Sequence, residues 1–159
     1  MTPFKSVYGR FLDLIEDDWY IELTESDTRR DMQNILIGAI PKFEFPKKSL
    51  DYNLEIDDVS LEDISSFKND LDEEEINILA YLMLLGWLQR QITSIDNTRQ
   101  KYYGNSFKLT SQANHLAKLD ALKVSIQKDT KYFQRLYKRR VKDEQGNIQS
   151  NWKIFNTYK

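Results

Sequence analysis

A run of uncharged, mostly apolar residues, INILAYLMLLGWL at 76–88, constrains the fold of this chain more than any other feature. Apolar side chains recur every three or four residues across 73–95, which predicts a helix. The apolar residues of its main face are Ile76, Leu79, Ala80, Met83, Leu84, Trp87, Leu88 and Ile92, and those of its other faces are Ile78, Tyr81, Leu82 and Leu85. A helix that is apolar nearly all round must be buried on all sides, by its own domain or by a subunit interface. The run is too short to span a membrane, for which about 20 residues are needed.

The residues around this run refine the prediction. Asp72 suits the N-cap position, and Glu75, three residues later, completes a capping-box pattern. The acidic residues 72–75 complement the positive end of the helix dipole. Because four consecutive acidic residues point around the whole helix and do not converge, they do not indicate a metal site. Gly86 is unfavourable inside a helix and therefore indicates a close helix crossing.

The rest of the chain is also predicted to be mainly helical. Thr2 as N-cap and Pro3 at the first helical position open a helix that continues to about Ile15. A second helix begins near Ser26 and ends before Pro41, because the residue before a proline avoids helical geometry. We expect a short helix over 59–67, with Leu61, Ile64 and Phe67 inward, and a long one from Thr110 or Ser111 to Arg140. With only 5 Gly and 3 Pro in the chain, a sandwich or barrel with many turns is disfavoured. The predicted fold class is all-α in the main, a bundle of about four helices with a long C-terminal helix.

One segment breaks the helical pattern. Between 42 and 56 apolar residues alternate with polar ones, and this period of two indicates a small extended segment. Such a segment must pack on the helices or pair with another chain, because a lone hairpin is only marginally stable. The candidates for a subunit interface are aromatic and apolar residues of this segment and of the polar connector 97–109: Phe43, Phe45, Tyr52, Leu54, Tyr102 and Tyr103.

The helical pattern lapses after Val141, which divides the chain into a helical bundle domain, 1–140, and a C-terminal docking arm, 141–159. Residues 143–147 are predicted to form a turn. Large apolar residues in a terminal arm usually dock, either on the parent domain or on another protein, and we favour another protein. The predicted docking residues, including two arginines at the root of the arm, are Arg139, Arg140, Ile148, Trp152, Phe155 and Tyr158.

Charge is divided unevenly along the chain. Residues 1–75 hold 20 acidic and 8 basic side chains, whereas residues 76–159 hold 5 acidic and 15 basic ones. This division predicts an electrically polar molecule that stacks head-to-tail on itself or meets partners of opposite sign at its two ends. The alternative is that the two halves neutralise each other inside one monomer.

Several classes of site are excluded by composition. With no Cys and the single histidine His115, the chain lacks disulfides, thiolate metal sites and multi-histidine sites, and a Ser/His/Asp triad is disfavoured. The sequence contains no phosphate-binding glycine loop and no hydrolase or metalloprotease motif. We therefore expect no enzyme activity, no cofactor and no bound metal. The segment MTPFKSVYGRF lacks the apolar core of a signal peptide, and we expect no membrane partner.

Nucleic-acid binding is the main alternative function. The region 128–142 has seven basic residues with Tyr132, Phe133 and Tyr137 interleaved. Basic side chains bind phosphates and aromatic rings stack on bases, so this region predicts a DNA-binding accessory protein. However, Phe133 lies on the apolar stripe of the helix, and the net charge of −2 lacks the basic excess of a dedicated DNA binder. A solvated helix face is the simpler interpretation.

Three segments carry a resemblance to a known group of proteins. KFEFP at 42–46, EEINILA at 74–80 and WLQRQITSIDNTRQKYYGNSFKLTSQANHLAKL at 87–119 resemble small structural-module proteins of tailed bacteriophages, the head–tail connector or neck adaptor proteins. The resemblance extends to about Arg140. It implies a helical subunit of a ring, typically of twelve copies, in the neck of the virion and assembled in the host cytoplasm.

The resemblance also implies partners. In such adaptors the helical bundle forms the ring body, and a C-terminal arm grips the portal protein above it. Neighbouring copies of the chain form the ring, the next neck or tail component binds below, and DNA passes through the channel without specific binding.

A third interpretation, a small host-directed or regulatory interaction protein, would be absent from purified particles.

Overall fold

A computed structural model describes residues 1–15, 24–57, 63–101, 106–142 and 148–150 of the chain. The prediction of a mainly helical bundle with a long C-terminal helix is confirmed. The helices are α1 (Phe4–Leu12), α3 (Glu25–Ala39), α4 (Glu73–Lys101) and α5 (Ser106–Arg139), with a single 3-10 turn, η1 (Ile40–Lys42), after α3. Among the described residues, no helix combines the length and the hydropathy needed to cross a membrane.

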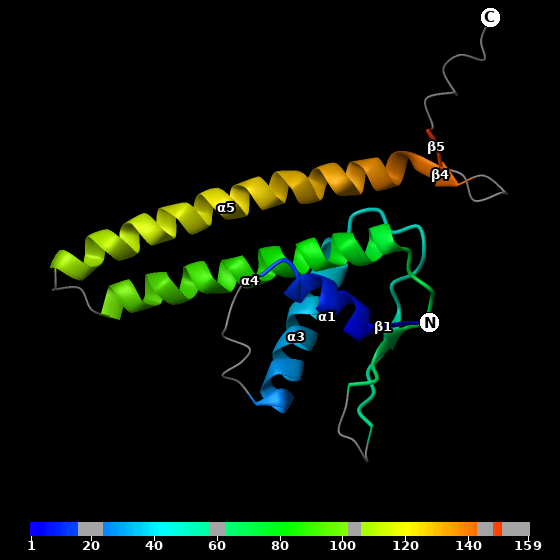
Figure 1. Cartoon of the computed structure of the whole chain (residues 1–159), viewed down its shortest axis with the longest axis horizontal. Helices are drawn as coiled ribbons and strands as arrows, with labels where there is room; N and C mark the ends of the chain where they lie inside the picture. Colours follow the sequence, from blue (N-terminus) through cyan, green and yellow to red (C-terminus); the bar gives the residue numbers. More distant parts are fainter. Residues whose placement is uncertain (16–23, 58–62, 102–105, 143–147, 151–159) are drawn as a thin grey trace, which may run out of the picture.

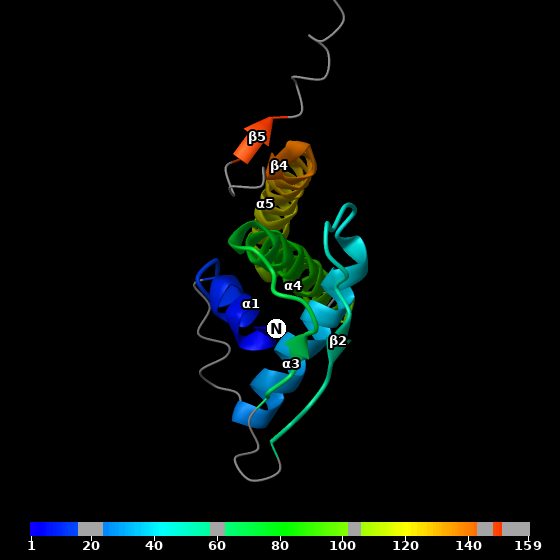
Figure 2. The same ribbon diagram turned by 90° about the vertical axis from the view of Figure 1, so that its right-hand side faces the viewer.

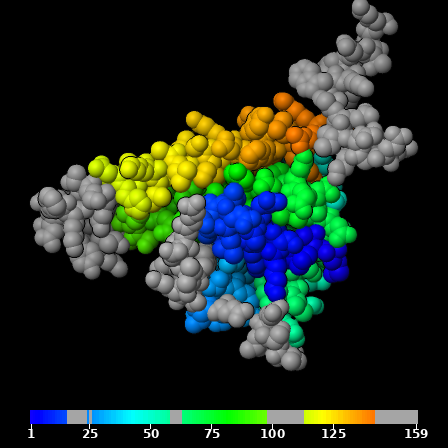
Figure 3. All heavy atoms as spheres, in the orientation of Figure 1, coloured from blue at the N-terminus to red at the C-terminus, as the bar shows by residue number. Residues whose placement is uncertain are grey.

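Helix α4 is the centre of the molecule. Helix α5 lies along one side of it, and α1 and α3 pack on the other side (Figure 1). The two long helices continue as a pair beyond α1 and α3. Figure 3 shows α5 along the upper edge of the molecule and the N-terminal residues below it, in front of part of α4. The apolar run therefore sits between two layers, which confirms that its own domain buries it.

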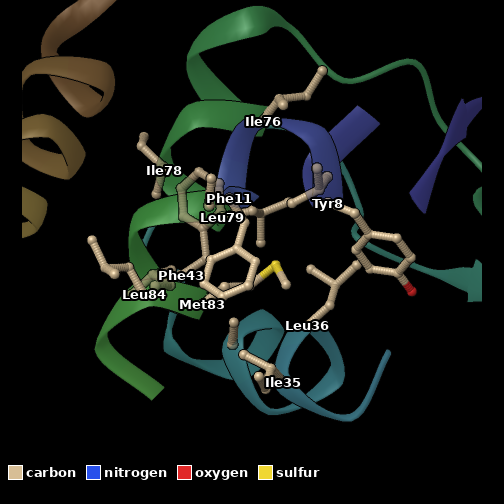
Figure 4. Close-up of a cluster of buried hydrophobic side chains, with 14 of the residues drawn as sticks. Tyr8, Phe11, Ile35, Leu36, Phe43, Ile76, Ile78, Leu79, Met83 and Leu84 are labelled. Carbon is tan, nitrogen blue, oxygen red and sulfur yellow. The ribbon is translucent and has the colours of Figure 1, made fainter. Parts of the chain in front are cut away.

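The core is formed where α1, α3 and α4 meet (Figure 4). The stripe predicted for the first helix supplies Phe4, Val7 and Phe11, all fully buried, while Leu12 at its end is exposed. Helix α4 supplies Leu79 and Met83. Each large side chain of this kind contributes about 1.5–3 kcal/mol on burial. The run at 76–88 in α4 supplies more buried apolar side chains than α1 or α3. The other core residues of α3 and α4 are Met32, Ile35, Leu36, Ala39, Ile76, Ile78, Ala80, Leu82, Leu84 and Leu88.

Helix ends follow the predicted chemistry at α4 and differ at α1. The backbone N–H of Asp72 donates to Oε2 of Glu75 at 2.8 Å, as the capping-box pattern predicts. At α1 the predicted capping role of Thr2 is wrong, because its hydroxyl accepts a hydrogen bond from the Leu71 N–H at 2.7 Å and Pro3 occupies the N-cap position. Thr2 is thus used in tertiary structure instead of capping its own helix.

A small antiparallel sheet occupies one end of the bundle. Its order is β1 (Thr2–Pro3), β3 (Ser66–Phe67) and β2 (Tyr52–Asn53). The extended segment predicted near 42–56 is therefore confirmed at β2, and Ile56 adds an isolated bridge to Asp63. Before β2, residues 40–42 form the 3-10 turn instead of extended structure.

The short helix predicted over 59–67 is wrong at its C-terminal end, where Ser66–Phe67 form β3. Asp63, Ser65 and Phe67 are buried and Ile64, between them, is 49% exposed, which is the alternation of an extended chain. Residues 58–62 lie outside the described part of the chain. The polar residues point inward because they are hydrogen-bonded there: Ser65 N donates to Asp63 Oδ1 at 2.9 Å.

A second pair of strands continues from α5. Strand β4 (Arg140–Lys142) follows the helix without a break and pairs antiparallel with β5 (Ile148–Ser150). This hairpin stands at the end of α5, on the far side of the long helices from the small sheet (Figures 1 and 2). The first ten residues of the predicted arm thus include a two-stranded hairpin, whose predicted turn at 143–147 lies outside the described residues. The division into a bundle, 1–140, and an arm, 141–159, remains a prediction.

Candidate docking site at the end of helix α5

The end of α5 is fastened to the beginning of α4 by buried polar groups. We call this cluster the arm root; its residues are Phe43, Glu44, Lys47, Glu74, Glu75, Gln134, Tyr137 and Arg140. The Tyr137 hydroxyl donates a hydrogen bond to Oε1 of Glu75, and both side chains are buried. Gln134, also buried, accepts a hydrogen bond from the Glu44 N–H at 2.7 Å. Helix α5 is therefore joined both to α4 and to the chain segment that follows η1.

Glu75 is a fully buried carboxylate at the centre of the arm root. It accepts hydrogen bonds from the Asp72 N–H and from Tyr137, and the ammonium group of Lys48 lies 3.7 Å from its Oε2. A buried carboxylate is tolerated only with such partners. Burial raises the pKa of Tyr137, and its hydrogen bond to Glu75 raises it further. Tyr137 therefore stays neutral, and its hydroxyl group continues to donate its proton to the hydrogen bond with Glu75.

The start of the hairpin is fixed by Lys47 and Glu74. The Lys47 ammonium group donates to the carbonyl oxygen of Arg140 and lies 4.2 Å from the centre of the Tyr137 ring. The Arg140 guanidinium group forms an ion pair with Glu74. The Phe43 ring packs edge-on against Tyr137, with 5.6 Å between ring centres. As a result the chain that leaves α5 starts from a fixed position on the bundle.

A cleft of about 210 Å³ opens beside the arm root, between α4 and α5. Its apolar lining comes from Ile78, Phe133 and Leu136, and its polar rim includes Asn77 and Glu74. This combination suits an apolar side chain whose neighbouring backbone or polar groups contact the rim.

The exposed face of α5 is strongly basic. Lys128, Lys131, Arg135 and Lys138 follow each other at helical spacings of three and four, and Arg139 adjoins them. All five are exposed, and none forms an ion pair with another residue in the described part of the chain. Lys138 instead places its ammonium group 3.8 Å from the centre of the Phe45 ring. We call these five residues the basic face.

The charge asymmetry of the sequence is thus divided between two outcomes. Some charges are neutralised within the monomer, as in the ion pairs of Arg140 with Glu74 and of Arg90 with Asp31. The basic face has no such partner among the described residues and points outward. Neutralisation within the monomer therefore accounts for part of the charge asymmetry, and stacking or binding to charged partners stays a prediction.

The predicted subunit-interface residues that the structure describes differ in burial. Phe43 is only 5% exposed and packs on Tyr137, so its prediction as an interface residue is wrong. Tyr52 is half-buried, with its ring 5.6 Å from that of the core residue Phe4. Phe45 and Leu54 are exposed, as an interface would require. Tyr102 and Tyr103 lie outside the described residues.

The predicted arm residues have different positions as well. Arg139 is exposed, and Arg140 forms an ion pair with Glu74 in its own chain; partner binding by these two arginines stays a prediction. Ile148 belongs to β5. The other predicted docking residues, Trp152, Phe155 and Tyr158, lie outside the described residues.

Sequence reasoning missed the role of Tyr137 and Gln134 in the arm root. The sequence groups Tyr137 with the basic, aromatic stretch, although it lies four residues after Phe133 on the apolar stripe of α5. That spacing is the signal that could have placed it against α4.

A second cleft, of about 320 Å³, was also missed; it lies between α1 and α3. Its lining includes Tyr8, whose hydroxyl donates to Oδ2 of the buried Asp63 at 3.1 Å. Burial raises the pKa of Tyr8, and Asp63 raises it further. The sequence carries only a weak signal for the contact between Tyr8 and Asp63, because the two residues are distant in the chain.

Within the described ranges, no three His, Cys, Asp or Glu side chains are grouped so as to hold a metal ion. Comparisons with models of protein families, with curated proteins and with solved structures yield no match to the chain.

Proposed function

We propose that this protein is a structural adaptor of a tailed-bacteriophage particle, a subunit of a ring that joins the portal protein to the next component of the neck or tail. In this proposal the helical bundle is the body of the ring, through whose channel DNA passes. The C-terminal arm docks on the portal. The resemblance of the segments at 42–46, 74–80 and 87–119 to neck adaptor proteins suggests this role.

The observation that carries the proposal is the arm root. An arm that bears load between two assemblies needs a rigid base, because ordering a loose segment on binding costs conformational entropy. The buried Tyr137–Glu75 hydrogen bond and the Arg140–Glu74 ion pair supply this base at the residue where the arm begins. The hairpin of β4 and β5 then leads away from the bundle (Figure 2).

The experiment for this proposal removes the arm and retains the bundle. Deletion of residues 147–159 should abolish co-sedimentation with the portal protein of the same genome, while the far-ultraviolet circular dichroism per helical residue stays unchanged. A milder variant, Phe155→Ala with Tyr158→Ala, should have the same effect without shortening the chain. A matched control is Leu122→Ala with Val124→Ala, two exposed apolar residues of α5 distant from the arm. Undiminished portal binding by both arm variants would contradict the proposal.

A second candidate function is favoured by the basic face. Five exposed cations without ion-pair partners among the described residues form, on one side of α5, an array suited to the phosphates of duplex DNA. The preference of a helix C-terminus for cations accounts only for Lys138 and Arg139 in the last turn, and leaves Lys128, Lys131 and Arg135 unexplained. In this alternative the protein is a DNA-binding accessory protein, and its affinity for DNA falls steeply with salt.

A further inference from the structure

Strand β2 leaves one side of the small sheet open. Among the described strands, in the order β1-β3-β2, it has a neighbour on one side only. The Lys68 N–H donates to the Asp51 carbonyl at 2.8 Å, and the Ile64 N–H donates to the Glu55 carbonyl at 3.1 Å. Because backbone groups alternate in direction along a strand, the N–H groups of Leu54 and Ile56 point to the opposite, open edge. Neither forms a hydrogen bond with another described residue.

The side chains along this edge are those of an interaction surface. Leu54 is 50% exposed and Ile56 is 56% exposed, so two large apolar side chains lie in solvent beside unpaired backbone groups. Proteins normally protect such an edge, because it is a template for pairing with another strand. The segment 51–57, DYNLEID, has three acidic residues and no basic one. A strand that pairs here should therefore be apolar and basic.

The chain itself contains such a strand. The hairpin of β4 and β5 has only two strands, and a two-stranded hairpin is marginal in water unless another strand or surface completes it. Strand β5 begins the segment IQSNWKI at 148–154, which contains the large apolar residues Ile148, Trp152 and Ile154 and no acidic residue. Lys153 and Lys159 are the only charged residues of 145–159. The lysine of the segment 148–154 is opposite in charge to the acidic residues of 51–57. The apolar residues of the two segments can pack on each other.

Pairing of β5 with β2 must occur between chains. Strand β4 is held at the arm root, because Arg140 contacts Glu74 and its carbonyl accepts from Lys47. The long helices separate the hairpin from the small sheet in both ribbon views (Figures 1 and 2). Since β5 is paired with β4, it cannot reach the β2 edge of its own chain while the arm root is intact.

We infer that residues 148–154 of one copy of this protein add as a strand to the open β2 edge, residues 51–57, of a second copy. Backbone hydrogen bonds supply the affinity, and the contacts of the arm with Leu54 and Ile56 supply the specificity. The interface is heterologous, so each copy offers an arm to one neighbour and an edge to the other. A repeated contact of this kind closes into a ring when the rotation between copies is a whole fraction of a turn.

This inference deepens the proposed function, because it names the contact that joins neighbouring subunits. The closure of that contact into a ring rests on the proposed function. It moves Ile148 and Trp152 from the contact with the portal to the contact between copies. Phe155 and Tyr158 remain for the portal. The two contacts therefore have separate residues and separate tests.

Disulfide trapping tests the pairing directly, because the natural chain has no cysteine. One full-length variant carries Leu54→Cys, and a second carries Ser150→Cys or Trp152→Cys. After mixing under mild oxidation, a disulfide-linked heterodimer should form. The matched control is Ile64→Cys, which is as exposed as Leu54 but whose N–H is already bonded to Glu55 inside the sheet. Equal trapping by the control, or no trapping at protein concentrations up to about 1 mM, would overturn the inference.

A proline variant provides the second measurement. Leu54→Pro removes only an outward N–H, which an edge strand tolerates, so the bundle should fold normally. Self-association should weaken at least tenfold in light scattering, whereas binding to the portal should remain. The variant Phe155→Ala/Tyr158→Ala should give the reverse result, with loss of portal binding and intact self-association. Leu54→Pro therefore tests the contact between copies and the double variant tests the contact with the portal, so failure of one proposal is distinguishable from failure of the other. If the double variant Leu54→Cys/Ser150→Cys closes a disulfide within a monomer, pairing between copies is disproved.

Discussion

Tyr137 on α5 donates a hydrogen bond to Glu75 on α4, and the two side chains are buried together although 62 residues separate them in sequence. This contact fastens the end of the longest helix to the start of the central one. It also sets the point from which the C-terminal arm departs. The contact therefore contributes to stability at the place where the strand β4 begins.

Replacing Tyr137 by Phe should destabilise the protein by about 1–3 kcal/mol. The ring is retained, but Glu75 loses its hydroxyl partner while it stays buried. The measurement is the free energy of unfolding in urea. Tyr132→Phe serves as the control, because Tyr132 is 57% exposed and its change should stay within about 0.5 kcal/mol. Equal effects of the two substitutions would show that the arm root does not contribute to stability.

Alkaline pH should weaken the fold through Tyr8 and Tyr137. Tyrosine titrates near pH 10 in an unfolded chain, and burial raises the pKa of both residues in the folded protein. Their contribution to stability is therefore complete below about pH 10 and is lost as the pH rises above it. Unfolding free energies measured between pH 8 and pH 11 should fall less steeply for Tyr8→Phe/Tyr137→Phe than for the parent protein. Parallel pH profiles would contradict this assignment.

Gly86 should tolerate alanine. The sequence predicted a close helix crossing here, and α3 does lie opposite Gly86. However, an added Cβ would meet Cγ2 of Ile35 at 3.7 Å, which is an ordinary contact. Since alanine is the better helix former, Gly86→Ala should raise the unfolding free energy by about 0.5–1 kcal/mol. A loss of stability would mean that the crossing is tighter than this geometry indicates.

Substitutions in the basic face test the second candidate function. Lys131→Gln with Arg135→Gln and Lys138→Gln should leave stability nearly unchanged, because the three side chains are exposed. If DNA binds here, the affinity for a random duplex, followed by fluorescence anisotropy, should fall at least tenfold. The slope of log affinity against log salt concentration should become shallower by about 0.9 for each phosphate that the variant no longer neutralises. A suitable control is Lys42→Gln with Lys68→Gln, two exposed lysines outside α5. Unaltered DNA affinity in the basic-face variant would remove this candidate.

The helical part of the fold could be predicted because its signals are local. The acidic residues 72–75 followed by the apolar run predicted both the start and the burial of α4. The error at 59–67 arose from long-range contacts. Ser65 is buried because its hydroxyl donates to the Glu55 carbonyl at 3.2 Å and accepts from Gln33, and no local pattern reveals these partners. The same holds for Thr2, whose hydrogen-bonding partner is 69 residues away.

The candidate site was only partly predictable. The end of the long helix at Arg139 followed from the lapse of the helical pattern after Val141. Alternation placed Phe43 and Phe45 on one face of an extended segment, but it could not tell which of them faces the chain's own core. The structure buries Phe43 against Tyr137 and leaves Phe45 exposed beneath Lys138. The unpaired edge of β2 could not be seen in the sequence, because it depends on the strand order of the sheet.

The central claim, that this chain is an adaptor subunit docked on a portal, is tested most directly by native mass spectrometry of the protein mixed with the portal protein of the same genome. An adaptor subunit should form a single large assembly with about twelve copies on each portal ring, even if the free protein is a monomer. The variant lacking residues 147–159 should be absent from that assembly. If the full-length protein forms no complex with the portal, the adaptor assignment is contradicted and DNA binding by the basic face becomes the leading function.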